Sequence, residues 1–362
     1  MKQNKTWVWV ATAIGLLVLP LVLQAAGNFW VRIADFALLY VLLALGLNIV
    51  VGYAGLLDLG FVAFFAIGAY MYGLMASPHL SESFQWFAQM FPNGLHTSIW
   101  LVIPLGAALA GILGVLLGAP TLKLRGDYLA IVTLGFGEII RVFMNNLDHP
   151  VNITNGPKGL GQIDSISILG LNFGKRLEIF GYELASVTLY YYLFLALVVI
   201  SVIICHRLEV SRIGRAWMAI REDEIAAKAM GINTRNMKLL AFGMGATFGG
   251  VSGTMFAAFQ GFVSPESFSL MESVMIVAMV VLGGIGHLPG VILGAVLLSA
   301  LPEVLRWVSG LMDLQALTGG RLDASILRQL LIALAMIIVM LLRPRGLWPT
   351  PEHGKALQPA GR

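Results

Sequence analysis

Residues 206–238 read HRLEVSRIGRAWMAIREDEIAAKAMGINTRNMK, and this polar stretch separates two apolar runs, 187–205 and 239–262. It holds seven Lys or Arg residues and four acidic residues. A basic segment between two membrane spans lies on the cytoplasmic side. Its portion 215–230 contains no Gly or Pro and is rich in Ala, Met, Glu and Lys, which predicts a helix closed by Gly231 in the C′ position. We therefore expect a cytoplasmic helix that lies beside the membrane.

The composition is that of a polytopic membrane protein. Hydrophobic residues make up 58% of the 362 residues, charged residues make up 12%, and the mean hydropathy is +0.84. A soluble domain of this size exposes far more charge. The net charge of +4 is modest and lies in loops, so it bears on membrane orientation and argues against nucleic-acid binding. The single cysteine, Cys205, excludes an intrachain disulfide and a cysteine-built metal site.

Ten apolar segments of about 20 residues predict an all-α fold with about 10 (8–10) transmembrane helices in a lipid bilayer. If both termini lie in the cytoplasm, every strongly basic loop lies inside, as the positive-inside rule requires. We expect one transmembrane domain over 1–349, with a cytoplasmic loop at 206–238, a periplasmic segment at 147–186, and a disordered cytoplasmic tail at 350–362. The candidate spans are 7–26, 33–51, 56–76, 98–118, 127–146, 187–205, 239–262, 270–286, 289–309 and 325–342.

The first candidate span could also be a signal peptide, because two lysines precede its apolar run. The run is long, no strict small-x-small cleavage site follows it, and further spans come at once. We therefore expect an uncleaved first span.

Two glycine-rich stretches interrupt the apolar sequence, GYAGLLDLG at 52–60 and GGIGHLPG at 283–290. Broken helices occur at membrane depth where they line a polar cavity. We therefore expect broken or re-entrant segments here, and we take the residues around them as candidates for the translocation path. These are Asn48, Gly52, Tyr53, Gly55 and Asp58 at the first break, and Gly283, Gly284 and Gly286 at the second.

Simpler structural roles compete with several of these assignments. Asp58 can cap a half-helix, Asn48 can form an interhelical hydrogen bond, and His287 can be a turn histidine instead of a proton-coupling group. Glu138 with Arg141, and Glu303 with Arg306, stand three residues apart on one helix face and can pair with each other. Glycines at spacings of four predict close helix packing within the chain, with a subunit interface as the alternative: Gly245, Gly249 and Gly253; Gly286, Gly290 and Gly294; Gly114 and Gly118.

The sequence contains no enzyme motif. The phosphate loop G-x-x-x-x-G-K-[ST], the zinc motif H-E-x-x-H and the nucleophile elbow G-x-S-x-G are all absent. We therefore expect a chain that is not an enzyme and binds no metal or cofactor. If ATP drives its function, another chain must hydrolyse the ATP.

Residues 224–231 (EIAAKAMG) resemble the E-A-A-x-x-x-G loop of permeases in ATP-binding-cassette importers, with Ala226, Ala227 and Gly231 in register. In that family the loop is a short coupling helix that docks in a groove of the ATPase. The chain departs from the motif, because Ile225 stands where the motif has its Glu, Glu224 comes one position early, and no I-x-L-P follows Gly231. The resemblance implies the ATPase-coupling candidates Arg215, Arg221, Glu222, Asp223, Glu224, Ala226, Ala227 and Gly231. A solvated amphipathic loop that only fixes orientation is the alternative.

Five separated blocks make the resemblance more specific. They look like the LivM-like permease subunits of branched-chain amino acid importers, and the similarity runs from about residue 33 to 349. The blocks are LGLNIVVGYAGLLDLGFVAFFAIGAY (45–70), GDYLAIVTLGFGEIIRV (126–142), TNGPKGL (154–160), RIGRAWMAIREDE (212–224) and RPRGLWP (343–349).

This resemblance implies a permease subunit of a bacterial inner membrane, which forms half of the path for leucine, isoleucine and valine by alternating access. Its implied partners are a LivH-type sister permease in a heterodimer, two cytoplasmic ATPases of the LivG and LivF type, and a periplasmic amino-acid-binding protein. ATP and Mg would be used by the ATPases, not by this chain.

Two other functions stay open. Permeases for urea and short amides look much alike, and no residue here fixes the substrate. An ion-coupled secondary transporter would work alone through its membrane acids, such as Asp58, Asp127 and Glu272. Such acids are few, and the coupling-like stretch would then have no role.

The coupling assignment predicts the behaviour of a charge-reversal variant. Glu222→Arg combined with Glu224→Arg should uncouple ATP hydrolysis from uptake while the protein stays in the membrane, because charge pairs at a docking surface set its register. Uptake and ATP hydrolysis measured on the same vesicles check this. Undiminished uptake in the double variant would refute the assignment.

Overall fold

The computed structural model describes residues 2–121, 124, 126–168, 171–179 and 182–311, and beyond them residues 330, 333, 334, 337, 338, 341, 342 and 346–348. Three features expected from the sequence fall wholly or largely outside these residues: the basic pair Lys123 and Arg125, most of the span at 325–342, and the tail at 350–362.

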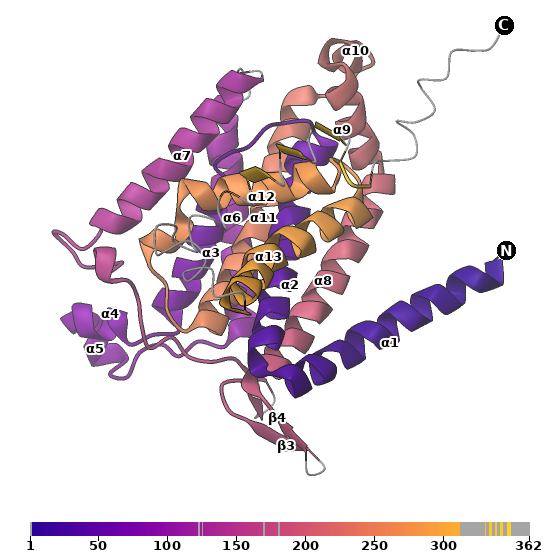
Figure 1. The fold of residues 1–362 in the computed structure, drawn as a ribbon. Helices are drawn as coiled ribbons and strands as arrows, with labels where there is room; N and C mark the ends of the chain where they lie inside the picture. Colours follow the sequence, from indigo (N-terminus) through magenta and orange to yellow (C-terminus); the bar gives the residue numbers. More distant parts are fainter. Residues whose placement is uncertain are drawn as a thin grey trace, which may run out of the picture.

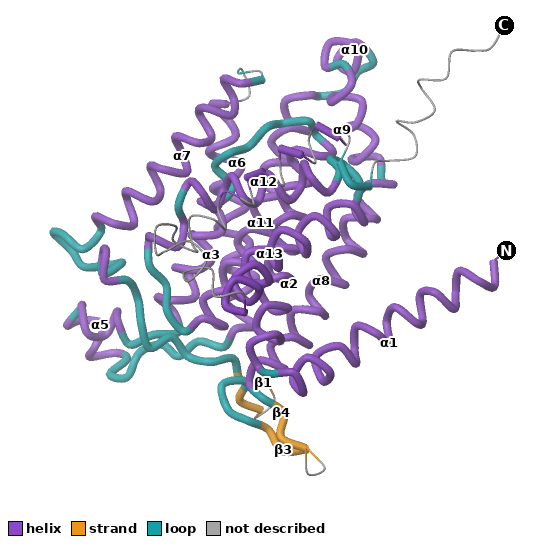
Figure 2. The backbone as a smooth tube through the Cα atoms, viewed as in Figure 1, coloured by secondary structure: helices purple, strands orange, loops and turns teal. Residues whose placement is uncertain are grey.

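The described chain is almost entirely helical (Figures 1 and 2). Two short antiparallel hairpins are its strands: β1 (Ser167–Ile168) pairs with β2 (Leu171–Asn172), and β3 (Leu177–Ile179) pairs with β4 (Tyr182–Leu184). The α-helices are α1 (Lys2–Ala26), α2 (Asn28–Asn48), α3 (Val62–Met75), α4 (His79–Ser83), α5 (Gln85–Met90), α6 (Ile99–Thr121), α7 (Asp127–Asn146), α8 (Ser186–Val210), α9 (Arg212–Glu222), α10 (Glu224–Ala229), α11 (Thr234–Gln260), α12 (Leu270–Gly283) and α13 (Leu288–Leu311). A π-helical turn, η1 (Ile49–Tyr53), extends α2, and two 3-10 turns are η2 (Gly156–Lys158) and η3 (Pro265–Phe268).

A helix lies in each of the first nine candidate spans, and α7 has the predicted bounds 127–146. Two of the predicted spans were longer than the observed helices. The span predicted to start at 56 begins as a helix at Val62, and the span predicted to end at 286 stops at Gly283. At 14 residues each, α3 and α12 are about 21 Å long, whereas the hydrocarbon core is about 30 Å thick. Both are therefore half-helices, and each adjoins one of the two breaks.

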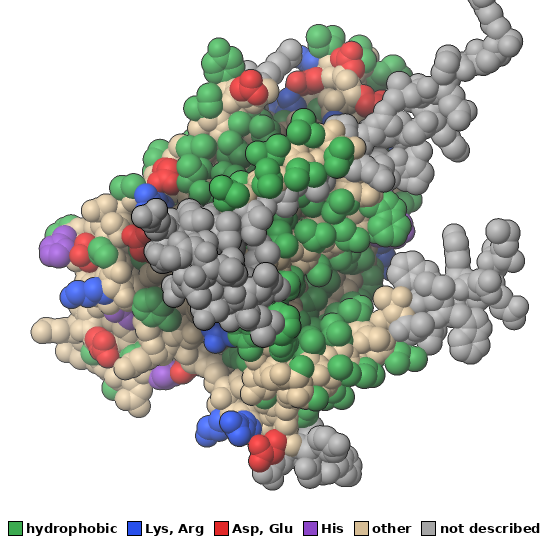
Figure 3. Space-filling model, viewed as in Figure 1, with side chains coloured by type: hydrophobic (Ala, Val, Ile, Leu, Met, Phe, Trp, Pro, Cys, Tyr) green, Lys and Arg blue, Asp and Glu red, His purple; other side chains and the backbone are tan. Residues whose placement is uncertain are grey.

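Four helical stretches of the described residues are long and apolar enough to cross a membrane, namely Asn28–Tyr53, α6, α8 and α11. On the face shown in Figure 3, hydrophobic side chains cover the middle of the molecule, and charged side chains gather toward its ends. This distribution matches an apolar belt between two aqueous surfaces.

Helix α11 is the centre of the bundle and packs on α6, α3 and α2. Glycines allow these helices to pack closely. On α11, a Cβ atom added at Gly245 would collide with α2 and its extension η1, and one added at Gly249 or Gly253 would collide with α3. On α6, a Cβ atom added at Gly114 would collide with α11. Gly294 of α13 lies in the same way against Gly283 of α12. The glycine sets therefore pack helices within the chain, as expected.

The two ends of the bundle differ (Figure 1). Helices α9 and α10 lie at one end, whereas α4, α5 and the hairpin β3–β4 lie at the opposite end, and α1 extends away from the bundle. The stretch 206–238 and the segments 77–97 and 147–186 therefore occupy opposite ends, as the alternating topology predicts.

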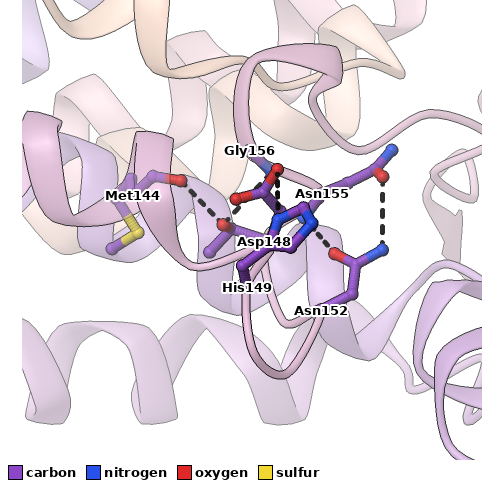
Figure 4. Close-up of polar contacts among 7 residues, drawn as sticks. Met144, Asp148, His149, Asn152, Asn155 and Gly156 are labelled. Atoms are coloured by element: carbon purple, nitrogen blue, oxygen red, sulfur yellow. Dashed lines mark hydrogen bonds and ion pairs between the residues drawn. The ribbon is translucent and has the colours of Figure 1, made fainter.

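The segment after α7 is held by its own hydrogen bonds (Figure 4). The Thr154 hydroxyl donates to the Met144 carbonyl at 2.7 Å, and Asn155 adopts a left-handed conformation at φ +60°. Leu160 and Val263 then exchange two backbone hydrogen bonds of 2.8 and 2.9 Å. The TNGPKGL block thus ties the loop after α7 to the end of α11.

Replacing Gly68 by alanine should lower the thermal stability of the protein in detergent. The added Cβ atom would collide with the Gly250 carbonyl, and backbone atoms cannot move aside without shifting a helix. Overpacking of this kind costs roughly 1–3 kcal/mol. The control is Gly135→Ala on α7, where nothing lies within 4 Å of the added atom. Equal melting temperatures for the two variants would contradict the close packing of α3 on α11.

Candidate functional site

The two helix breaks lie side by side, and Asn48 joins them. The Oδ1 atom of Asn48, at the end of α2, accepts a hydrogen bond of 2.9 Å from the backbone N–H of Gly286, between α12 and α13. The Asn48 side chain is fully buried. A Cβ atom at Gly52 would meet the Asn48 amide and the Gly286 nitrogen. Asn48 therefore forms a structural hydrogen bond, but its partner is the turn between α12 and α13, not another helix as the interhelical alternative had predicted.

The side chain of Arg221, on α9, also contacts these two breaks. Its Nη1 atom donates to the Gly52 carbonyl at 2.5 Å. Gly55, at φ +68°, and Gly286, at φ +83°, adopt conformations that side-chain-bearing residues rarely accept. An added Cβ atom would lie 2.7 Å from the Arg221 Cγ atom at Gly55, and 2.9 Å from its Nη1 atom at Gly286.

We call Asn48, Gly52, Gly55, Arg221 and Gly286 the break junction. The sequence assigned these residues to two separate sites, with Arg221 in the coupling stretch and the others in the path. The fold brings them together, so the polar stretch and both membrane breaks form one structural unit.

Residues 346–348, within the C-terminal block RPRGLWP, contact the second break. Leu347 donates its backbone N–H to the Leu282 carbonyl at 2.8 Å, and Trp348 donates to the Gly283 carbonyl at 3.2 Å. The Trp348 ring lies 6.2 Å from that of His287. In the sequence, RPRGLWP served only as one of the blocks that carry the family resemblance. No pattern in the sequence predicts its contact with residues more than sixty positions earlier.

Asp58 closes a local turn ahead of α3: its Oδ1 atom accepts from the Gly60 backbone N–H at 2.8 Å. It does not cap the helix, because the N-cap position of α3 is Phe61 and no side chain caps it, so the predicted capping role is wrong. The cavity that Asp58 lines measures about 10 Å³, the size of one water probe. Of the eight path candidates, all but Gly55 are buried. In this conformation they pack against protein, and their place along a path stays a prediction.

The stretch 212–230 contains two helices, α9 and α10, so the single helix predicted over 215–230 was wrong. Asp223 is extended at φ −153°, and its side chain accepts from the backbone N–H groups of Ile225 at 2.8 Å and Ala226 at 3.0 Å. Asp223 is thus the N-cap of α10, and a capping aspartate favours a new helix start over continuation.

The predicted end of this stretch at Gly231 is confirmed. Gly231 has φ +85°, its N–H donates to the Lys228 carbonyl, and the Ile232 N–H donates to the Ala227 carbonyl, both at 3.1 Å. This pair of bonds is the Schellman motif, in which a left-handed glycine closes a helix.

Several contacts fasten α9 and α10 to α11. The fully buried Trp217 donates from its indole to the Met237 carbonyl at 2.7 Å. Glu224 pairs with the buried Lys238 at 2.7 Å, and Ala227 is buried. Arg215 bonds to the Val210 carbonyl at 2.7 Å. These contacts hold the stretch to the bundle as a firm unit.

Two large apolar residues are exposed on α10 and its C-cap, at positions outside the coupling candidates predicted from the sequence. Ile225 is 71% exposed, and Met230 is 84% exposed. The candidates Glu222 and Ala226 are exposed beside them. The signal in the sequence was two large apolar residues inside a charged stretch. We call Ile225 and Met230 the apolar tip.

The charged residues in the apolar segments are mostly paired. Glu138 and Arg141 are 2.9 Å apart, and Glu303 and Arg306 are 3.0 Å apart, as predicted. Glu272, which had no partner evident in the sequence, accepts a short hydrogen bond from the Tyr40 hydroxyl.

Comparison with known proteins gives a family match. Residues 29–341 match the family described as branched-chain amino acid transport system / permease component. The chain is 40% identical over 350 residues to the high-affinity branched-chain amino acid transport system permease protein LivM of Escherichia coli K12, covering 92% of this chain and 74% of that protein. It is 26% identical over 330 residues to the LivH permease protein of Salmonella typhimurium LT2, covering 87% and 93%. No solved structure matches the chain.

Arg221→Gln should lower the melting temperature in detergent, because the buried Gly52 carbonyl loses its charged donor. A buried acceptor without a donor costs roughly 1–3 kcal/mol. Arg212→Gln is the control, since it removes the same charge from an exposed position on the same helix. If both variants lower the melting temperature equally, the loss of a positive charge explains the effect, and the hydrogen bond from Arg221 to Gly52 does not contribute to stability.

Proposed function

Because the chain belongs to the branched-chain amino acid transport permease family, we propose that it forms half of the translocation path of an ATP-binding-cassette importer for leucine, isoleucine and valine. Its relatives include permease proteins of both the LivM and the LivH type, which supports a heterodimer with a LivH-type sister permease. Two LivG- and LivF-type ATPases and a periplasmic amino-acid-binding protein complete the proposed importer.

The observation that carries this proposal is the connection from the apolar tip to the break junction. Helix α10 presents exposed Ile225 and Met230 at one end of the bundle. Helix α9, which precedes it, bonds through Arg221 to the first break, and Asn48 links the first break to the second. A force applied to α10 therefore reaches both half-helices through direct contacts.

We propose that the apolar tip docks in a groove of an ATPase subunit. Exposed large apolar side chains at a charged end of the molecule are the kind of anchor that contributes most to an interface. Glu222, exposed beside them, would set the register of docking more than its strength.

The proposed transport step is alternating access. ATP binding draws the two ATPases together and shifts α10, which moves with α9 because Trp217 and Glu224 fasten both to α11. Arg221 then tilts the first break, and the Asn48–Gly286 bond carries the second break with it. The half-helices α3 and α12 would change their tilt around these breaks.

This proposal places the end that bears α9 and α10 in the cytoplasm, together with both chain termini. The opposite end, with α4, α5 and the hairpin β3–β4, would face the periplasm and receive the binding protein. The basic character of 206–238 supports this orientation.

A second candidate function lies within the same architecture, the import of urea or short amides. The match to LivM proteins over 92% of the chain favours amino acids. An ion-coupled secondary transporter is less well supported, since it gives no role to an exposed apolar tip joined to both breaks.

Replacing Ile225 and Met230 by serine should weaken ATPase binding about tenfold or more, because losing two buried anchors costs at least about 1.4 kcal/mol. Retention of the ATPases on this chain during purification, followed by titration, measures the effect. Met90→Ser is the matched control, since Met90 is 71% exposed at the opposite end. Full retention by the double serine variant would refute docking at the tip.

A further inference from the structure

A cavity of about 420 Å³ lies between α2, α12 and α13, away from the break junction. Tyr40, in its wall, precedes Asn48 by eight residues on α2, or about 12 Å of helix. The volume falls in the range of small-molecule sites, about 300–1,000 Å³. Neither the sequence motifs nor the coupling scheme accounts for this space.

The cavity carries two opposite charges held by neutral partners. Arg32 donates to the Gln260 side chain at 2.8 Å, and its guanidinium lies 5.8 Å from the centre of the Phe36 ring. Glu272 accepts from the Tyr40 hydroxyl. Within the described residues neither Arg32 nor Glu272 forms an ion pair within 4 Å, so each group is oriented mainly by its neutral partner.

The other charged groups nearby add no net charge to the cavity. Glu303 and Arg306 also line it, and they pair with each other at 3.0 Å. Asp35, one turn further along α2, is fully buried and interacts electrostatically with both Arg32 and Tyr191, but it does not line the cavity. Arg32 and Glu272 therefore offer one positive and one negative site.

The rest of the wall is largely apolar and includes Phe36, Met275, Met279 and Leu298. Methionine side chains are flexible and adapt to different apolar shapes. A wall of this kind suits aliphatic side chains of several sizes better than one rigid shape.

We propose that this cavity is a transient subsite for a zwitterionic amino acid with an apolar side chain, on its way through the permease. Arg32 would receive the carboxylate, Glu272 would receive the ammonium group, and Met275 and Leu298 would contact the side chain. This inference rests on the proposed function and adds the place where substrate pauses. Because each charge already has a neutral partner, substrate exchanges with Gln260 and Tyr40 and is not trapped.

The test uses the assembled importer in proteoliposomes, with its ATPases and leucine-loaded binding protein. Arg32→Gln and Glu272→Gln should each lower leucine uptake per ATP hydrolysed about tenfold, because a charged hydrogen bond to substrate is lost. Stimulation of ATP hydrolysis by the loaded binding protein should stay within about twofold of the wild type, because the coupling contacts are intact. Arg141→Gln is the control, since it removes a membrane charge on α7 that pairs with Glu138 outside the cavity.

A second variant tests the apolar wall without changing a charge. Met275→Trp narrows the cavity, so uptake of leucine and isoleucine should fall at least about threefold more than uptake of valine. A merely structural defect would lower uptake of all three substrates alike. The ratio of leucine to valine uptake by Met275→Trp therefore tests the subsite even if the Arg32 or Glu272 variant assembles poorly.

The outcomes separate the two proposals. If the wild-type importer takes up leucine and the variants at Arg32, Glu272 and Met275 match it in rate and selectivity, the cavity is not a substrate site and the proposed function stands. If the wild-type complex hydrolyses ATP without moving any leucine, isoleucine or valine, the proposed function fails and the cavity assignment fails with it.

Discussion

The hydrogen bond from Arg221 to the Gly52 carbonyl is the contact on which the rest of this structure depends. A break in a membrane helix leaves backbone groups without their helical partners, and lipid offers none in exchange. Arg221 brings a charged donor from outside the span, and Asn48 supplies an acceptor to the second break. Two interruptions that would each be unfavourable alone thus stabilise each other.

This junction explains the distribution of glycine around it. Gly55 and Gly286 need positive φ angles and leave room for the Arg221 side chain, and Gly52 leaves room for Asn48. Further from the junction, glycines allow α11 to touch α2, α3 and α6, so the half-helix α3 rests on a rigid centre. The structure therefore combines a closely packed core with two short helices that end at one polar joint.

Local patterns predicted the local features of the fold well. The length of the apolar segment predicted the bounds of α7, the glycine after a helical run predicted the cap at Gly231, and the three-residue spacing predicted the pair Glu138–Arg141. The helix start at Asp223 was missed, because a mid-stretch acid is compatible with both a continuous helix and a cap. Contacts such as Arg221–Gly52 and Leu347–Leu282 join distant segments, and no single-sequence pattern records which distant groups meet. The exposure of Ile225 and Met230 was missed for the same reason, since only the packing of α10 on α11 decides which side faces out.

The most direct test of the account is to purify this chain from mild detergent, identify the proteins that accompany it, and measure ATP hydrolysis with and without leucine-loaded binding protein. The account predicts a sister permease and two ATPases in the complex, and faster hydrolysis when the loaded binding protein is added. A chain that purifies alone and moves amino acid in proteoliposomes under an ion gradient would contradict it.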